Sequence, residues 1–251
     1  MSKIISIHSY RGGTGKSNTT ANLATLLAMG GHRVGVVDTD IQSPGIHALF
    51  GLEEAVMKHS LNDYLWGICD ISDAAYDVTG NLQAEISGKI FLIPSSLKAG
   101  EIARVLREGY DVGLLDSGFQ ELLKVLELDA LLIDTHPGLN EETLLSIAIS
   151  DKVVLILRPD QQDYMGTSVT VEVARKLDVA QLLLVVNKVP EVFDFNEVKT
   201  KIEKTYSCEV AALLPHADEM MILGSNGIFA IEYPDHEVTA SLKQLAERLL
   251  V

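Results

Sequence analysis

The chain has 251 residues, of which 47% are hydrophobic and 22% charged, and its formal net charge is −15. This size and apolar content suit one large α/β domain with a substantial core, and no apolar run approaches membrane-spanning length. The acidic charge opposes non-specific attraction to DNA or acidic lipid, so contact with nucleic acid would need a local basic patch.

Short apolar runs alternate with amphipathic segments. The predicted strands are Ile4–His8, Val34–Asp38, Ile90–Pro94, Leu131–Asp134, Val153–Leu157, Leu182–Asn187 and Ala211–Leu214. The predicted helices are Ser17–Met29, Ala99–Arg107, Glu121–Leu126, Glu141–Ile149, Ser168–Lys176, Asn196–Thr205 and Glu237–Leu250. Runs this apolar are typical of strands covered on both faces. The repeating order predicts an α/β fold, a doubly wound, mostly parallel sheet with helices on both faces, in a single domain over residues 1–251. The irregular stretch Glu53–Gly88 is expected to be a helical excursion.

The cysteines and the first residues bear on the compartment. Cys69 and Cys208 are far apart and lack a metal-ligand spacing, which predicts reduced thiols in a cytosolic protein. The chain enters its first apolar run at once, without the pattern of a signal peptide. We therefore expect a cytoplasmic location.

A glycine run directly follows the first predicted strand. It consists of Arg11, Gly12, Gly13, Thr14, Gly15, Lys16 and Ser17, followed by Asn18. Glycines let consecutive backbone N–H groups point toward one centre, and the following helix adds its positive end. Lys16 supplies a charge for the β- and γ-phosphates, and the Ser17 hydroxyl suits Mg²⁺. The run therefore predicts a phosphate-binding loop rather than a strand–helix turn without a ligand.

Three carboxylates follow predicted strands. Asp38 and Asp40 come at the end of the second strand, and Asp134 closes the apolar run Leu131–Ile133. The carboxyl ends of parallel strands meet at one edge of the sheet, where ligands bind. One of Asp38 and Asp40 can therefore hold the water shell of Mg²⁺ while the other orients the attacking water, and Asp134 can anchor Mg²⁺ directly or through water. The alternative for Asp38 and Asp40 is a solvated turn without a ligand.

The turn after Asp134 contains His136 and Gly138. Gly138 can bring a backbone N–H close to the γ-phosphate, so the turn could distinguish ATP from ADP. His136 could act as a base, but a single histidine in a loop is more often a packing or hydrogen-bonding residue.

The glycine run departs from the common phosphate-loop pattern, because Tyr10 stands where that pattern has glycine. It resembles instead the deviant loop of the ParA/MinD family of ATPases, K-G-G-x-G-K-[ST], with Arg11 at the signature lysine. The segments from Asp38 and from Asp134 resemble the two switch motifs of that family, D-x-D-x-x-x-P and D-x-P-x-G. The surroundings of Arg11 and the segment Arg158–Tyr164 resemble McdA, the branch that positions carboxysomes.

The resemblance implies a P-loop fold, ATP and Mg²⁺ as cofactors, and slow ATP hydrolysis that depends on Asp40. It also implies that Asn187, Pro215 and His216 frame the adenine. Adenine is favoured over guanine because an N-K-x-D motif is interrupted by Pro190.

The resemblance further implies an ATP-dependent homodimer in which the signature lysine contacts the partner's phosphates. Arg11 could pair bidentately with a phosphate or lie in solvent. Lys152, just before the fifth predicted strand, is a second candidate. The resemblance to the carboxysome-positioning branch implies it, because in that branch the crossing lysine is displaced from the loop. An ordinary exposed lysine is the alternative reading of Lys152.

Three functions compete. An ATP dimer could bind DNA non-specifically on the nucleoid and position a cargo through an adaptor that stimulates hydrolysis. A membrane-cycling division-site regulator is less consistent with the last helix, which reads as core packing. A nucleotide-gated scaffold with little turnover is the third. An iron–sulfur carrier is disfavoured, because C-x-x-C is missing from the sequence. The candidate DNA-binding residues are Lys199, Lys201, Lys204, Lys243 and Arg248.

Overall fold

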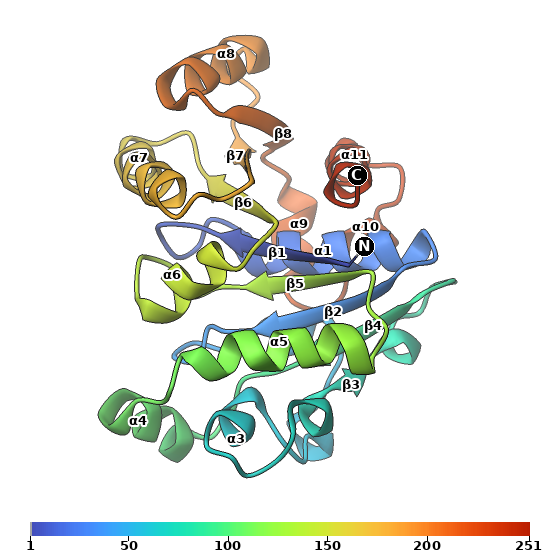
Figure 1. Ribbon diagram of the computed structural model, residues 1–251. Coiled ribbons are helices and arrows are strands. Elements are labelled where there is room, and N and C mark those ends of the chain that lie inside the picture. Colours follow the sequence, from blue (N-terminus) through green and yellow to red (C-terminus); the bar gives the residue numbers. More distant parts are fainter. Residues whose placement is uncertain (1) are drawn as a thin grey trace.

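The computed structural model describes residues 2–251. Its strands form one 8-stranded sheet in the order β3-β4-β2-β5-β1-β6-β7-β8 (Figure 1). The strands are β1 (Lys3–His8), β2 (Arg33–Asp38), β3 (Tyr76–Asp77), β4 (Lys89–Ile93), β5 (Ala130–Asp134), β6 (Lys152–Leu157), β7 (Gln181–Val189) and β8 (Glu209–Pro215). Neighbouring strands pair in parallel, except that β3 runs antiparallel to β4. The predicted α/β fold with a mostly parallel sheet is confirmed.

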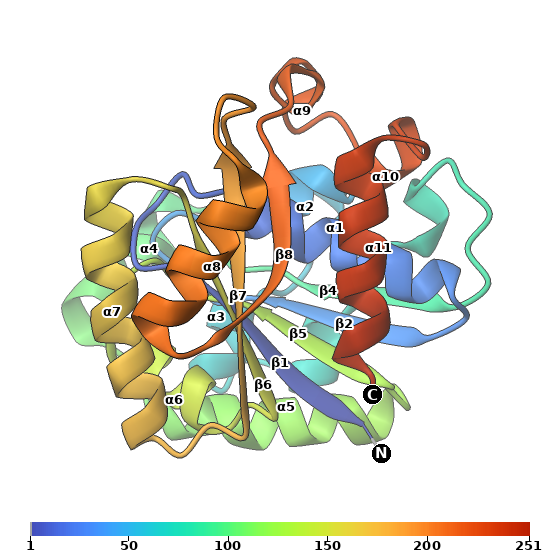
Figure 2. The same cartoon turned by 90° about the horizontal axis from the view of Figure 1, so that it is seen from above.

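The helices cover both faces of this sheet (Figures 1 and 2). They are α1 (Lys16–Met29), α2 (Ile46–Leu49), α3 (Leu61–Leu65), α4 (Ala99–Glu108), α5 (Gly113–Val125), α6 (Glu141–Ala148), α7 (Gln161–Lys176), α8 (Phe195–Tyr206), α9 (Asp218–Leu223), α10 (Phe229–Glu232) and α11 (Glu237–Leu249).

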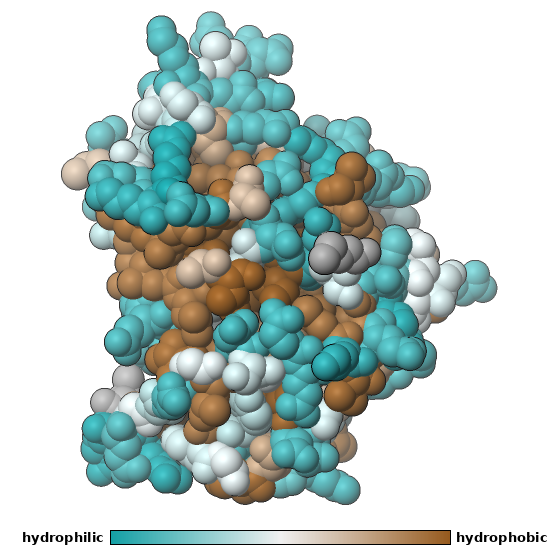
Figure 3. Space-filling model, viewed as in Figure 1, coloured by the Kyte–Doolittle hydropathy of each residue, from teal (hydrophilic) through white to brown (hydrophobic). Residues whose placement is uncertain are grey.

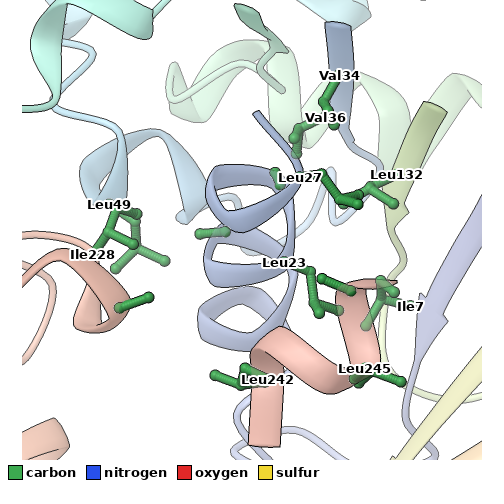
Figure 4. Packing of buried hydrophobic residues seen from close by; sticks show 14 of the residues in the cluster. Ile7, Leu23, Leu27, Val34, Val36, Leu49, Leu132, Ile228, Leu242 and Leu245 are labelled. Atoms are coloured by element: carbon green, nitrogen blue, oxygen red, sulfur yellow. The ribbon is translucent and has the colours of Figure 1, made fainter. Parts of the chain in front are cut away.

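The core divides by face, because alternate side chains of a strand point to opposite sides. Ile7 of β1 packs with Leu23 of α1 and with Leu245 of α11 (Figure 4). Ile4 of the same strand packs on the other face with Phe119 of α5. On that second face, α6, α7 and α8 cover β6 and β7 in a separate cluster.

The arrangement of β1 and β5 opens a crevice. These strands are neighbours, yet the helices that follow them, α1 and α6, pack on opposite faces of the sheet. Connections that diverge in this way leave room at the carboxyl ends of the strands, which is where open α/β sheets bind ligands. The phosphate loop and Asp134 follow β1 and β5, so the fold brings them to this crevice.

Two predicted helices begin earlier than expected. α5 starts at Gly113 and α7 at Gln161, so their first halves were missed. Each half contains a glycine, which lowers helix propensity. The glycines are used for close packing, since a Cβ on Gly118 would lie 2.8 Å from the Tyr64 ring, and one on Gly166 would overlap Tyr10.

The stretch Glu53–Gly88 is helical only in part. It holds α3, three short 3₁₀ turns and the two-residue strand β3, which was not predicted. Within residues 2–251, no helix is both long and apolar enough to cross a membrane. The apolar side of α11, including Val238, Leu242 and Leu249, is buried in the core, as its helical spacing predicted.

Candidate nucleotide-binding site

The N-terminus of α1 lies at the crevice with its backbone donors free of side-chain caps. Gly15, in the left-handed conformation at φ 94°, precedes the helix and makes no capping hydrogen bond. By contrast, α6, α7 and α8 begin with Asn140, Asp160 and Asp194, whose side chains accept from backbone N–H groups. Uncapped N–H groups at a helix start favour an anion.

Lys16 reaches across the crevice to the end of β5. Its ammonium donates to Asp134 Oδ1 at 2.8 Å, and both side chains are buried. The Thr20 hydroxyl lies 3.2 Å from the same carboxylate oxygen. Lys16 and Asp134 are therefore brought together as the loop and strand order predicted.

Asp38 is fully buried and organises the loop after β2. Its carboxylate accepts from the Asp40 N–H at 3.0 Å and from the Gly45 N–H at 3.3 Å. Asp38 is the register partner of Asp134 in the neighbouring strand. Burial, and then the charge of Asp134, raise the pKa of Asp38 well above its usual range. A pair of buried carboxylates with one lysine beside it suits an additional cation.

Asp40 lies between the phosphate loop and the turn after β5. One of its oxygens is 2.7 Å from Nδ1 of His136, and the two side chains are 15% and 22% exposed. Asp40 also lines the hollow over the phosphate loop, together with Pro137. The two loops that were predicted to respond to nucleotide are thus in direct contact.

Gly138 adopts φ 87° and donates its backbone N–H to the Ser9 carbonyl at 3.1 Å. This donor was expected to face a γ-phosphate, but in this structure it is bound to Ser9, two residues before the phosphate loop. The contact ties the turn after β5 to the loop after β1.

Two adjoining hollows follow the phosphate loop. One, of about 200 Å³, is lined by the loop from Gly12 to Asn18 and by Asp40. The other, of about 230 Å³, is lined by Asn187, Pro215, His216 and the residues around α9. Gly15 and Asn18 belong to both. A phosphate chain and a flat ring could therefore occupy neighbouring compartments.

Asn187 braces the phosphate loop, a contact that the sequence did not reveal. Its Nδ2 donates to the Thr14 carbonyl at 2.7 Å, and its Oδ1 accepts from the Lys188 N–H. The Lys188 ammonium donates to the Gly13 carbonyl at 3.0 Å. A Cβ at Gly15 would overlap Nδ2 of Asn187, so this approach requires glycine.

Arg11 points toward the start of α7. Its guanidinium lies 3.5 Å from Asp163 and 3.8 Å from Asp160, and it is 39% exposed. Arg158 shares both carboxylates, and its pKa is raised by the hydrogen bond with Asp163. Arg11 is therefore paired within its own chain instead of extending into solvent.

Lys152 lies at the amino end of β6, at the opposite edge of the sheet from the phosphate loop. Its side chain is buried, and the ammonium donates to the carbonyl oxygens of Arg248 at 2.7 Å and Val251 at 2.9 Å. These contacts bind the end of α11 to the sheet. The arrangement favours a structural role over the expected reach across a dimer, and it excludes the alternative of an exposed lysine.

His8, at the end of β1, is a fully buried histidine beneath the site. The Thr135 hydroxyl donates to the Ile7 carbonyl, so His8 Nδ1 must donate in its 2.7 Å contact with that hydroxyl. Within residues 2–251, His8 Nε2 has no hydrogen-bond partner. Burial, and then the charge of Lys16, lower the pKa of His8 to about 3, which keeps it neutral.

A comparison with protein families and curated proteins identifies relatives. A family model described as an AAA domain, AAA_31, matches residues 2–189. The chain belongs to this family. It is 27% identical over its whole length to one uncharacterized ATP-binding protein of Methanocaldococcus jannaschii, and the match covers 88% of that protein. It is 30% identical over 92% of its length to a second such protein of the same organism, and that match covers 81% of the relative. It is also 28% identical over 97% to an iron–sulfur cluster carrier protein of Pseudomonas fragi, covering 83% of it.

Solved structures share the fold. The cell division ATPase MinD of Pyrococcus furiosus matches with a TM-score of 0.82 at 21% identity, over 99% of this chain and 98% of that one. MinD of Pyrococcus horikoshii with Mg-ADP matches with a TM-score of 0.80 at 21% identity, over 99% of this chain and 96% of that one. A putative plasmid partition protein of Borrelia burgdorferi with AMPPNP matches with a TM-score of 0.75 at 20% identity, over 100% of this chain and 99% of that one. These findings support the resemblance to ParA/MinD ATPases.

Proposed function

We propose that the chain is an ATP-dependent switch that binds Mg-ATP at this crevice and hydrolyses it to ADP and phosphate. One observation carries the proposal: two adjoining hollows lie at the uncapped start of α1, beside the Asp38–Asp134 pair and Asp40. The phosphate loop would hold the phosphates, and the hollow beside Asn187, Pro215 and His216 would hold adenine. Turnover would be slow until a partner stimulates it.

The residues present fit a Mg²⁺ ion that is bound together with the nucleotide. Within residues 2–251, no group of three histidine, cysteine or acidic side chains could hold a metal alone. Mg²⁺ commonly takes one or two protein ligands and completes its shell with phosphates and water. Ser17, Asp38 and Asp134 would support it there, and the ion would neutralise charge on the phosphates. Asp40 would then accept the hydrogen bond that orients water.

Titration calorimetry with Mg-ATP and a phosphate-release assay test the proposal. Lys16→Ala should abolish binding, whereas Asp40→Ala should bind Mg-ATP and turn it over far more slowly, at a rate that can still be measured. No heat from wild-type protein at millimolar Mg-ATP would remove the proposal. Binding with no phosphate release in any condition would leave the nucleotide-gated scaffold.

We propose an ATP-dependent homodimer that closes over this face, with Arg11 as the candidate that reaches the partner's phosphates. Arg11 would have to leave Asp160 and Asp163, and Arg158 would remain as their counter-charge. Sedimentation velocity with ATP, ADP and no nucleotide tests the dimer. Arg11→Ala should weaken ATP-dependent association, and Arg11→Lys should retain it.

Non-specific DNA binding on the nucleoid is the proposed output of the dimer. The candidate basic residues fall on two faces, because α8 and α11 pack on opposite sides of the sheet. We favour α8, where Lys201 and Lys204 are exposed. This helix lies at one end of the molecule in Figure 1, and Figure 3 shows that end as mostly hydrophilic. Lys199 lies 4.0 Å from Glu203, and Arg248 pairs with Glu209, so these two are partly neutralised.

An electrophoretic shift on arbitrary duplex DNA tests this output. We expect retardation with ATP only, reduced by the double change Lys201→Glu and Lys204→Glu and retained by Lys243→Glu on α11. Retardation under none of these conditions would shift support to the membrane-cycling alternative. Sedimentation with anionic liposomes would then test that alternative, which is disfavoured because the apolar side of α11 is buried.

The proposed cargo is the carboxysome, positioned through a cargo-bound adaptor that stimulates hydrolysis. The resemblance of the Arg11 and Arg158–Tyr164 segments to McdA supports it, and in the structure these segments meet at the start of α7. Deleting the gene in its host and imaging labelled carboxysomes tests the cargo, since the proposal expects clustered instead of spaced bodies.

Iron–sulfur carriage, suggested by the names of several relatives, finds less support. Cys208 donates to the Leu182 carbonyl, and burial raises its pKa. Burial raises the pKa of Cys69 to about 11. Cluster ligands are thiolates, which both environments disfavour.

A further inference from the structure

The contact between His136 and Asp40 joins the two loops that flank the phosphate site. Asp38 and Asp134 are register partners in neighbouring parallel strands, so the segments that follow them leave the sheet side by side. Two residues along each segment, His136 Nδ1 and Asp40 Oδ1 meet at 2.7 Å. Both side chains are mostly buried, which strengthens a charge-assisted hydrogen bond relative to one in water.

The direction of this hydrogen bond follows from its partners. An ionised carboxylate only accepts, so Nδ1 of His136 carries the proton and donates it. One oxygen of Asp40 is then occupied, and the other remains to accept from a water molecule. The imidazole thereby fixes the rotation of the carboxylate that faces the phosphate-loop hollow.

His136 is itself held in place from the other side. Its carbonyl accepts from the Thr143 hydroxyl of α6 at 3.3 Å, and Pro137 restricts the backbone after it. The Asp40 backbone is fixed by its N–H bond to Asp38. Both ends of the contact are therefore anchored to strands or helices, as a positioning contact requires.

We propose that His136 is a positioning residue for hydrolysis: its Nδ1–H holds Asp40 in the orientation that receives the attacking water. The proposal rests on the proposed ATPase function. His136 does not touch the reacting atoms in this account. It acts through Asp40, so its loss should slow turnover without weakening the binding of Mg-ATP.

Three substitutions of His136 separate this role from packing. In His136→Asn, the side-chain amide places a donor where Nδ1 lies. His136→Gln moves that donor outward, and His136→Leu removes it. We expect kcat at saturating Mg-ATP to fall about tenfold in the Leu and Gln variants, the scale of one lost charged hydrogen bond. KM and the calorimetric affinity should stay within about twofold, and Asn should recover most of the rate.

Combination with Asp40→Ala gives the decisive readout. If His136 acts through Asp40, His136→Leu should slow the Asp40→Ala protein no further. Additive losses, an unchanged or faster kcat in His136→Leu, or an Asn variant as slow as Leu would each overturn the proposal. If the Leu variant unfolds, the comparison of Asn with Gln decides by the same criteria.

Failure of this inference differs from failure of the proposed function. A wild type that hydrolyses ATP and is indifferent to His136 overturns only the inference. A wild type that binds Mg-ATP without phosphate release overturns both.

Discussion

Gly166 of α7 lies directly against the ring of Tyr10, so the side chain just before the phosphate loop packs on bare helix backbone. A Cβ at Gly166 would overlap Cβ, Cγ and Cδ1 of Tyr10. Tyr10 occupies the position where the common phosphate loop has glycine, and Arg11 beside it pairs with Asp163 of the same helix. The start of the loop is thus fixed to α7 through two consecutive residues.

Gly166→Ala should therefore displace Tyr10 and distort the loop. We expect the free energy of unfolding to fall by about 1–3 kcal/mol, as in other overpacked sites, and the Mg-ATP affinity to fall with it. Gly100→Ala in α4 is the matched control, because nothing lies within 4 Å of the added methyl group, and it should be neutral or stabilising.

The double variant Tyr10→Ala with Gly166→Ala should recover part of the lost affinity if steric overlap is the cause. Loss of affinity in Gly100→Ala equal to that in Gly166→Ala would contradict this explanation. Both quantities are measurable by urea unfolding and calorimetry.

Asn187 should support phosphate binding as well as base binding, because its Nδ2 donates to the Thr14 carbonyl. Asn187→Ala removes this brace, and we expect affinities for ATP and for tripolyphosphate, which has no base, to fall by similar factors of about tenfold. Competition calorimetry measures both. A loss confined to ATP would show instead that Asn187 acts on adenine alone.

Lys152→Met keeps the length of the side chain and removes the ammonium that binds Arg248 and Val251. We expect unfolding to become easier by about 1–3 kcal/mol, since two carbonyl oxygens lose their donor. ATP-dependent dimerisation, followed by sedimentation velocity, should be unchanged. The exposed Lys58→Met serves as the control. Loss of dimerisation at unchanged stability would restore the crossing-lysine interpretation.

His8 should make the protein sensitive to acid. Its pKa is lowered from 6.5 to about 3 in the folded protein, so below pH 6.5 the unfolded chain binds a proton that the native state refuses. The free energy of unfolding therefore falls as the pH decreases from 6.5 toward 3. At pH 5 this loss amounts to about 2 kcal/mol.

His8→Asn provides the matched control for acid sensitivity, because its amide can still donate to the Thr135 hydroxyl and does not titrate. Urea unfolding of both proteins at pH 7 and pH 5 gives the difference, in which the other histidines cancel. Parallel pH curves for the two proteins would rule out His8 as the cause.

Every strand except β3 was predictable, because each is an apolar run bounded by polar residues. The strand order then placed Lys16, Asp38 and Asp134 at one edge of the sheet. The first halves of α5 and α7 were not predictable, because Gly118 and Gly166 weaken the helical pattern. These glycines allow close contacts with the rings of Tyr64 and Tyr10. Contacts such as Asn187 with Thr14 and His136 with Asp40 join distant segments, and nothing in either local sequence specifies the pair.

The position of β1 also has a consequence for biosynthesis. Residues 3–8 are made early, yet their strand lies between β5 and β6 and pairs with Ala130–Asp134 and with residues 152–155. During translation this apolar segment stays unpaired until the segments that form β5 and β6 have left the ribosome. We expect the nascent chain to engage chaperones over that interval, and nucleotide to be bound only once the central strands have assembled.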